Sequence, residues 1–213
     1  MDANFCVFLD AGHGGVNPQG QYVTPGKRYQ HNQGTFHDNG WFYEGVFNRQ
    51  IVYRVAQKLD RLRIQYKILS HSYLDNSLQN RVETANWYHR NFQRGFVVST
   101  HANAATTNAR GFEVYTSPGS TRSDNLATYL WEEVSTLLGS RIRMRPDLSD
   151  GDHDKEARFY ILTQTVMPAI LIEHLFFDNF EDATLLMDEE MQELFAEAQV
   201  RSIIRFANQF YQE

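Results

Sequence analysis

Two histidines and a glutamate stand directly after apolar runs that are typical of buried strands. His13 follows the apolar run 5–9 and Asp10, with a glycine on either side, and His101 and Glu173 each come after a later apolar run. Apolar runs without polar alternation predict strands covered on both faces. Because ligands bind at the carboxyl ends of such strands in open α/β sheets, we expect these three side chains to face one site.

A second carboxylate, Glu44, stands where a long polar passage gives way to a helical pattern. The apolar residues behind it recur at helical spacing: Phe47, Ile51, Val55, Leu59 and Leu62. A glutamate in the first turn of a helix either complements the helix dipole or reaches a ligand.

This set of residue types suits a hydrolytic zinc site. Two histidines and one carboxylate around an open fourth position form a common catalytic zinc set, and hydrolysis needs a further carboxylate to move protons. The contiguous motif H-E-x-x-H is absent, so distant segments would have to assemble the site. The residues alone leave open whether Glu44 or Glu173 would bind the metal.

The composition is that of a globular α/β protein. The chain has 213 residues, which suits one substantial domain, and 42% of them are hydrophobic. The aromatic share of 14% fits a carbohydrate-containing ligand, because exposed aromatic rings stack on sugars. The formal net charge of −6 argues against a general nucleic-acid binder, which needs a basic face.

Cysteine and hydropathy patterns exclude several classes. The single cysteine, Cys6, lies in the first apolar run, so we expect a buried thiol and neither an internal disulfide nor a cysteine-rich metal site. No secretory signal pattern is visible at the N-terminus. No run of about 18 apolar residues occurs, so no membrane insertion is expected.

Strand and helix patterns alternate along most of the chain. The expected strands lie at 5–10, 64–69, 95–100, 111–116 and 169–172, and the expected helices at 44–62, 123–138, 181–187 and 188–211, with a further helix that opens at 76–78. This alternation predicts an α/β fold, a single domain over residues 1–213 with a mostly parallel twisted sheet and helices on both faces.

Further expectations concern the helix that is predicted to open near Ser77. Ser77 is expected to cap a helix whose inner face is formed by Leu78, Val82 and Ala85. Arg81, on the same helix, is either a solvated or salt-bridged surface residue or a residue that orients a carboxylate near the site.

Two segments show no periodicity and are expected to be loops. Residues 141–158 are strongly charged and are expected at the surface. Residues 16–43 form a long polar insertion, which is either mobile and without chemical consequence or functional. In the functional case it would flank a groove and hold glycan or stem peptide through an aromatic residue: Tyr22, Tyr29, Trp41 or Tyr43. A narrower hypothesis is that His31 or His37 reaches a zinc ion and occludes it.

Six short segments follow one another in a characteristic order. They are Asp10-Ala11-Gly12-His13-Gly14-Gly15, Glu44 with Asn48, Ser77-Leu78-x-x-Arg81, Ser99-Thr100-His101-Ala102-Asn103-Ala104, Gly111-Phe112-Glu113-Val114-Tyr115 and Pro168-Ala169-Ile170-Leu171-Ile172-Glu173. In this order and context the chain resembles the zinc-dependent N-acetylmuramoyl-L-alanine amidases of the type-3 family, which act in cell-wall turnover and phage lysis. The resemblance covers nearly the whole chain.

The resemblance implies a function and a set of site residues. Zinc would be held by His13, Glu44 and His101, and Glu173 would be the catalytic carboxylate. The substrate would be peptidoglycan, cut at the amide that joins the lactyl group of N-acetylmuramic acid to L-alanine of the stem peptide. Zinc would polarise the amide carbonyl while Glu173 activates water.

Five positions near these motifs invite separate expectations. Asp10 and Asn103 are candidates for hydrogen bonds to the histidines, with structural turn roles as the alternative. Ala11 replaces a proline that is usual in the family, Gly45 replaces a lysine that commonly follows the zinc-binding glutamate, and His174 replaces a small residue. For His174 we expect a core or rim position, with contact to substrate as the alternative.

Other functions and contexts stay open on the sequence alone. The alternatives are another zinc peptidase or deacetylase acting on cell-wall substrates, or a non-catalytic wall-binding module. The protein would act outside the cytoplasm on the cell wall, reached by phage-type lysis or by dedicated secretion as an antibacterial effector. The sequence identifies no inhibitor or immunity partner.

Overall fold

A computed structural model describes residues 4–149 and 151–211, so the ends of the expected 1–213 domain and residue 150 of the expected 141–158 loop lie outside the described residues. Six strands form the main sheet in the order β4-β1-β5-β8-β6-β7. These strands are β1 (Cys6–Ala11), β4 (Gln65–Ile68), β5 (Gly95–Asn103), β6 (Glu113–Thr116), β7 (Lys155–Glu156) and β8 (Ala169–Phe176).

The sheet is mostly parallel, as expected. β1 pairs in parallel with β4 and β5, β5 with β8, and β6 with β7. Only the β6–β8 pair among these strands is antiparallel, which makes the sheet mixed. The predicted α/β class is therefore confirmed, and the carboxyl ends of β1, β5 and β8 lie along one edge.

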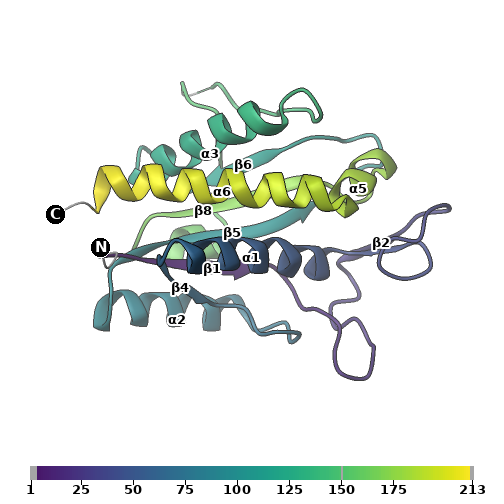
Figure 1. Cartoon of the computed structure of the whole chain (residues 1–213), viewed down its shortest axis with the longest axis horizontal. Coiled ribbons are helices and arrows are strands. Elements are labelled where there is room, and N and C mark those ends of the chain that lie inside the picture. Colours follow the sequence, from purple (N-terminus) through teal and green to yellow (C-terminus); the bar gives the residue numbers. More distant parts are fainter. Residues whose placement is uncertain (1–3, 150, 212–213) are drawn as a thin grey trace.

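Helices cover both faces of the sheet (Figure 1). Alternate strand residues point to opposite faces, so Val7 and Leu9 pack against one helical layer and Phe8 against the other. Figure 1 shows α1 and α6 side by side across one face, with α2 on the other side of the sheet. The helices are α1 (Glu44–Arg61), α2 (Leu78–Asn91), α3 (Arg122–Leu138), α4 (Tyr160–Gln164), α5 (Phe180–Met187) and α6 (Glu189–Phe210).

The long polar insertion is more ordered than its sequence indicates. It contains an antiparallel pair, β2 (Arg28–Gln30) and β3 (Trp41–Tyr43), which lies at the end of the molecule where α1 begins (Figure 1). Phe42 stacks on Phe177 with ring centroids 5.6 Å apart, which anchors the pair to the loop after β8. Because β3 runs directly into α1, this pair determines where Glu44 starts its helix.

One expectation for α2 is confirmed and another needs correction. The Ser77 side chain accepts a hydrogen bond from the backbone N–H of Asn80, so the predicted cap of α2 is confirmed. Val82 and Ala85 are buried, but Leu78 is 52% exposed and does not belong to the inner face. Leu78 instead lines a cleft together with Ser77 and Arg81.

Residues 141–158 are not a simple surface loop. Met144 forms a parallel bridge with Phe112, and Lys155 belongs to β7, so this segment pairs with both ends of β6. Asp154 is only 3% exposed and accepts a hydrogen bond from the Thr116 hydroxyl at 2.5 Å. Strand pairing with β6 is a non-local contact, which the local charge pattern could not indicate.

Asp154→Asn is expected to stabilise the fold above neutral pH. Burial, with the nearby charges of Asp152 and Asp124, raises the pKa of Asp154 from 3.8 to about 7. Because the folded-state pKa is raised, the carboxyl favours folding only while protonated, and this contribution is lost as the pH rises from about 4 to about 7. We expect a gain of about 2 kcal/mol at pH 8 and little gain at pH 4.5.

Thermal unfolding of the wild type and the variant at both pH values measures this difference. Asp60→Asn, at an exposed position, is the matched control and should show no such pH dependence. Equal shifts of Tm at pH 4.5 and pH 8 would show that the negative charge of Asp154 does not destabilise the fold.

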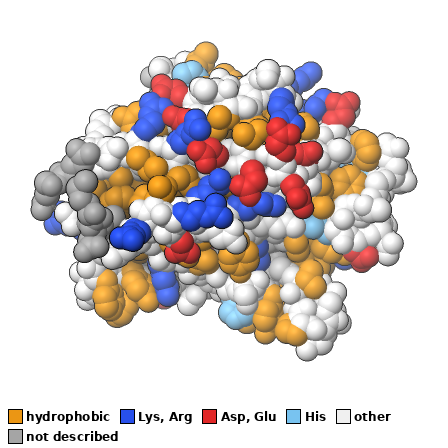
Figure 2. Space-filling model, in the orientation of Figure 1, with side chains coloured by type: hydrophobic (Ala, Val, Ile, Leu, Met, Phe, Trp, Pro, Cys, Tyr) orange, Lys and Arg blue, Asp and Glu red, His pale blue; other side chains and the backbone are white. Residues whose placement is uncertain are grey.

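Opposite charges intermix on the face shown in Figure 2, along the junction of α1 and α6. Arg54 and Lys58 of α1 pair there with Glu193 of α6, and Lys58 also reaches Glu197 at 3.3 Å. Such exposed pairs fix the register of two helices while contributing little stability. No helix in the described part of the chain has the length and apolarity needed to cross a bilayer.

Candidate metal centre

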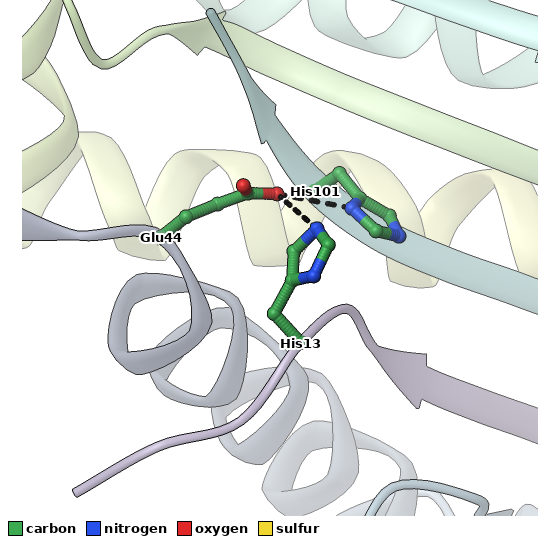
Figure 3. Close-up of side chains that lie close together, drawn as sticks. All are labelled: His13, Glu44 and His101. Atoms are coloured by element: carbon green, nitrogen blue, oxygen red, sulfur yellow. Dashed lines mark hydrogen bonds and ion pairs between the residues drawn. The ribbon is translucent and has the colours of Figure 1, made fainter. Parts of the chain in front are cut away.

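Three of the side chains predicted from sequence converge on one point (Figure 3). His13 follows β1, Glu44 begins α1, and His101 lies near the end of β5. Glu44 Oε1 is 3.3 Å from Nε2 of His13 and 3.0 Å from Nδ1 of His101. One donor atom from each residue lies within 4.8 Å of the other two, and this is the only such group of at least three His, Cys, Asp or Glu side chains among the described residues.

The turn that carries His13 is strained and is held by two arginines. His13 has φ 62, a left-handed conformation that is unfavourable for a residue with a side chain. Arg49 donates to the His13 carbonyl at 2.8 Å, and Arg81 donates to it at 3.3 Å. Arg81 also donates to the carbonyl of Ala11 at 2.6 Å, so the turn is fixed on both sides of Gly12.

Arg81 is fully buried, which corrects the expectation of a surface position. Its guanidinium pairs with Asp10 at 2.6 Å, and Ser99 donates a second hydrogen bond to Asp10 at 2.7 Å. The Asp10 carboxylate therefore accepts hydrogen bonds from Arg81 and Ser99, and neither of these partners is a histidine. Arg81 fulfils the other expectation, since it orients a carboxylate beside the site.

Asn103 also has a different partner from the one expected. Its side-chain amide donates to Glu113 Oε2 at 2.9 Å, not to a histidine. The nearest carboxylate to the far nitrogen of His13 belongs to Asp75, with Nδ1 and Oδ2 4.0 Å apart. Sequence reasoning missed Asp75, because the loop before α2 reaches the centre only through the tertiary fold.

Two glycines are required by close approaches at this centre. A Cβ on Gly12 would lie 2.0 Å from Cε1 of His101, and a Cβ on Gly45 would lie 1.8 Å from the carbonyl oxygen of Gly14. Gly45 therefore allows the first turn of α1 to pack against the His13 turn. The departure from a lysine at this position has a structural reason.

Gly12→Ala is expected to displace the His101 imidazole and weaken metal binding by about tenfold to a hundredfold, the cost of misplacing a ligand. The added Cβ overlaps the ring, so the ring must leave its place. Competition with a chromophoric chelator measures the zinc affinity. Gly26→Ala is the control, since no atom lies within 4 Å of its added Cβ. Equal zinc affinity in Gly12→Ala and the wild type would contradict the placement of His101.

Glu173 lies beside this centre, on the strand next to His101. The two residues are partners in the parallel β5–β8 register. Oε2 of Glu173 is buried and has no hydrogen-bond partner in the described chain. Burial, with the negative charges of Glu44 and Glu113, raises the pKa of Glu173 well above its usual value, while Lys27 opposes the shift.

A cleft of about 530 Å³ joins these groups to solvent. Its polar lining includes His13, His101 and Glu173, and its rim includes the exposed side chains of Phe159 and Tyr160. The sequence did not mark these two aromatic residues, because they lie at the start of the short helix α4, outside the recognised motifs.

The insertion contributes to the cleft differently from the expectation. Lys27 lines the cleft, whereas the four aromatic residues proposed for substrate binding are not among its lining residues. Tyr22 instead stacks on Tyr43 with centroids 4.4 Å apart, and its hydroxyl accepts a hydrogen bond from the Gly45 N–H at 3.0 Å. These rings support the first turn of α1.

The remaining histidines considered from sequence lie away from the centre. His31 Nε2 is 3.0 Å from the Phe177 carbonyl, and His37 Nδ1 accepts from the Tyr43 N–H, so neither histidine belongs to the group of His13, Glu44 and His101. His174 is buried, with Nδ1 2.9 Å from the His101 carbonyl, as expected for a core histidine. Burial lowers the pKa of His174 to about 4, so its imidazole is neutral.

The donor set fits zinc. Imidazole and carboxylate are both zinc ligands, and three protein donors leave a fourth position for water or substrate. Glu44 is 2% exposed, and its hydrogen bonds and charge interactions with the two histidines lower its pKa to about 2 against the opposing effect of burial. The carboxylate is therefore ionised, as a metal ligand must be. The Asn48 amide donates to the Gly12 carbonyl at 3.0 Å and reaches Glu44 Oε1 at 3.5 Å, which orients the carboxylate.

Comparisons with known proteins agree on one family. The family model described as N-acetylmuramoyl-L-alanine amidase matches residues 7–205. An uncharacterized protein, YqiI of Bacillus subtilis (strain 168), is 28% identical over 95% of this chain and 85% of its own length. The endolysin of Bacillus phage SPP1 is 27% identical over 95% of this chain and 66% of its own length. The crystal structure of an N-acetylmuramoyl-L-alanine amidase from Clostridium difficile 630 superposes with a TM-score of 0.75 at 26% identity, covering 99% of this chain and 100% of that one.

Proposed function

The chain belongs to the N-acetylmuramoyl-L-alanine amidase family, and we propose that it is a zinc-dependent amidase whose metal ligands are His13, Glu44 and His101. The resemblance noted from sequence is thereby confirmed, and cell-wall amidase activity follows from the family. The observation that carries the zinc proposal is the convergence of three ligand atoms within 4.8 Å of one another. Zinc bound there supplies Lewis-acid polarisation of the scissile carbonyl and of the attacking water.

Glu173 is proposed as the group that moves protons. Its unpartnered Oε2 is free to accept a proton from the attacking water and to return one to the departing amine. Burial and the neighbouring carboxylates raise the pKa of Glu173, which makes its carboxylate a stronger base than a solvated glutamate. The water oxygen forms a bond to the lactyl carbonyl carbon, the C–N bond breaks, and L-alanine leaves with a free amino group.

The surrounding residues hold this arrangement in place. Arg49 and Arg81 fix the strained His13 turn, so His13 need not reorganise when substrate arrives. The cleft admits an extended substrate along the sheet edge. We propose that residues 1–213 act as one catalytic domain and that the action takes place outside the cytoplasm, where peptidoglycan lies.

Mass analysis of digested peptidoglycan tests the proposal against its alternatives. An amidase releases stem peptides with new L-alanine amino termini and leaves N-acetylated muramic acid intact. A deacetylase would give free amines on the sugars, a peptidase would cut within the stem, and a wall-binding module would give no products. Any of these three patterns in a zinc-loaded sample would contradict the proposed function.

A further inference from the structure

A second polar cluster lies beside the proposed catalytic glutamate. Glu113 on β6 is the direct partner of Glu173 on β8 in the antiparallel register, so the two side chains share a face of the sheet. Glu113 is 2% exposed and its charge is close enough to raise the pKa of Glu173. This cluster is therefore continuous with the proposed site but is not used by the mechanism above.

The Glu113 carboxylate accepts hydrogen bonds from four side chains, and two of these are cations. Oε1 accepts from Arg145 Nε and from Lys155 Nζ, both at 2.6 Å. Oε2 accepts from the Asn103 amide at 2.9 Å and from the Tyr115 hydroxyl at 2.8 Å. Glu113 is one carboxylate between two cations, so Arg145 and Lys155 can each interact with a further carboxylate that approaches from solvent.

The two cations reach solvent. The Arg145 side chain is 40% exposed and the Lys155 side chain is 26% exposed, although Glu113 between them is buried. The only hydrogen bond of the Arg145 side chain within the described chain uses Nε, which leaves the two terminal nitrogens available. A guanidinium with free terminal nitrogens binds carboxylates in a bidentate manner.

Strand pairing places both cations on the face that carries Glu173. Lys155 is the partner of Tyr115 in the parallel β6–β7 pair, and the Phe112–Met144 bridge sets Arg145 beside Glu113. Neighbouring strands lie about 4.8 Å apart, so the cations stand roughly 5–10 Å beyond Glu173 along the sheet edge. One residue of extended peptide spans about 3.5 Å, so a carboxylate one or two residues beyond the scissile amide falls within this distance.

The other side of the centre has mixed charge. Asp75 is 35% exposed but is paired with Arg81 at 3.1 Å, and Lys27 also lines the cleft. The direction of the substrate therefore rests on Arg145 and Lys155 alone, which would attract an acidic peptide to their side of the scissile amide and leave the other side to the uncharged glycan. The peptide would run from Glu173 over β6 toward β7.

We propose that Arg145 and Lys155 form a subsite for a free carboxylate of the stem peptide, on the second residue, and so make the enzyme selective for acidic over amidated stems. This inference rests on the proposed amidase function for the direction of the substrate. The subsite itself is a carboxylate-binding site and has its own binding test.

The test uses two soluble muramoyl peptides that differ only in whether the carboxylate of the second stem residue is free or amidated. Binding is measured by calorimetry with zinc-loaded Glu173→Gln protein, and kcat/KM with the wild type. We expect the free acid to be preferred by about tenfold or more in both measurements, the effect of one charge-assisted hydrogen bond. Arg145→Gln should reduce this preference to less than about threefold, and Lys155→Gln should reduce it in part.

Each single variant leaves one cation on Glu113, and circular dichroism with thermal unfolding checks that both fold. Arg141→Gln, which removes an exposed arginine paired with Glu190, is the matched control and should keep the full preference. Equal binding of acid and amide by Glu173→Gln, or a preference that survives in both Arg145→Gln and Lys155→Gln, would overturn the subsite. If the acid is preferred in binding but neither compound is cleaved by the wild type, the proposed function fails while the subsite stands.

Discussion

Glu173→Gln is expected to lower the rate of amide cleavage by at least about a thousandfold while zinc stays bound. The substitution keeps the size and position of the side chain but removes its ability to accept a proton. Glu173 is not part of the His13, Glu44 and His101 group, so metal affinity should change little. Steady-state cleavage of a soluble muramoyl peptide gives kcat, and metal analysis of the same sample gives the zinc content.

Glu190→Gln is the matched control for this substitution. Glu190 is 71% exposed and pairs with Arg141 at the surface, so its loss should leave both kcat and zinc content unchanged. A Glu173→Gln enzyme that contains zinc and retains wild-type kcat would remove Glu173 from the mechanism. A variant that loses its zinc would show instead that Glu173 is a metal ligand.

Glu44→Gln is expected to weaken zinc binding by at least about a hundredfold. The carboxylate supplies both the negative charge and the oxygen that lies between the two histidines, 3.3 Å from His13 and 3.0 Å from His101. An amide oxygen is a weaker ligand and carries no charge. Because Glu44 is 2% exposed, water cannot readily take its place. Chelator competition measures the affinity, and cleavage rates at saturating zinc show whether activity returns.

Glu193→Gln is the control for this second substitution, because Glu193 pairs only with residues of α1 among its ion-pair partners in the described chain. It should bind zinc like the wild type. If Glu44→Gln also binds zinc with wild-type affinity, the metal is held elsewhere or is not needed. Loss of zinc with an unchanged far-ultraviolet spectrum would confirm that the effect is local.

The convergence of His13, His101 and Glu173 could be predicted because it depends on strand order. Each follows an apolar run, and parallel strands bring their carboxyl ends to one edge. Glu44 was identifiable because helical spacing begins directly after it. Apolar runs and helical spacing are local patterns, so the positions that follow from them can be predicted without knowledge of the tertiary contacts.

The supporting residues could not be predicted because their partners are distant in the sequence. The sequence left Arg81 as either a surface residue or a residue that orients a carboxylate, because its buried partner Asp10 lies 71 residues earlier. Glu113 gave no sign that Arg145 and Lys155 would surround it, because that depends on the pairing of β6 with β7. The same holds for the β2–β3 pair, whose polar residues lack periodicity and are ordered through stacking of Phe42 on Phe177.

The most direct test of the central claim is mass analysis of purified peptidoglycan digested by three samples: protein as prepared, protein dialysed against a chelator, and chelated protein with zinc restored. A zinc site formed by His13, Glu44 and His101 predicts that stem peptides with free L-alanine amino termini form in the first sample, vanish in the second and return in the third. Release of the same peptides by the chelated, verified zinc-free protein would contradict it.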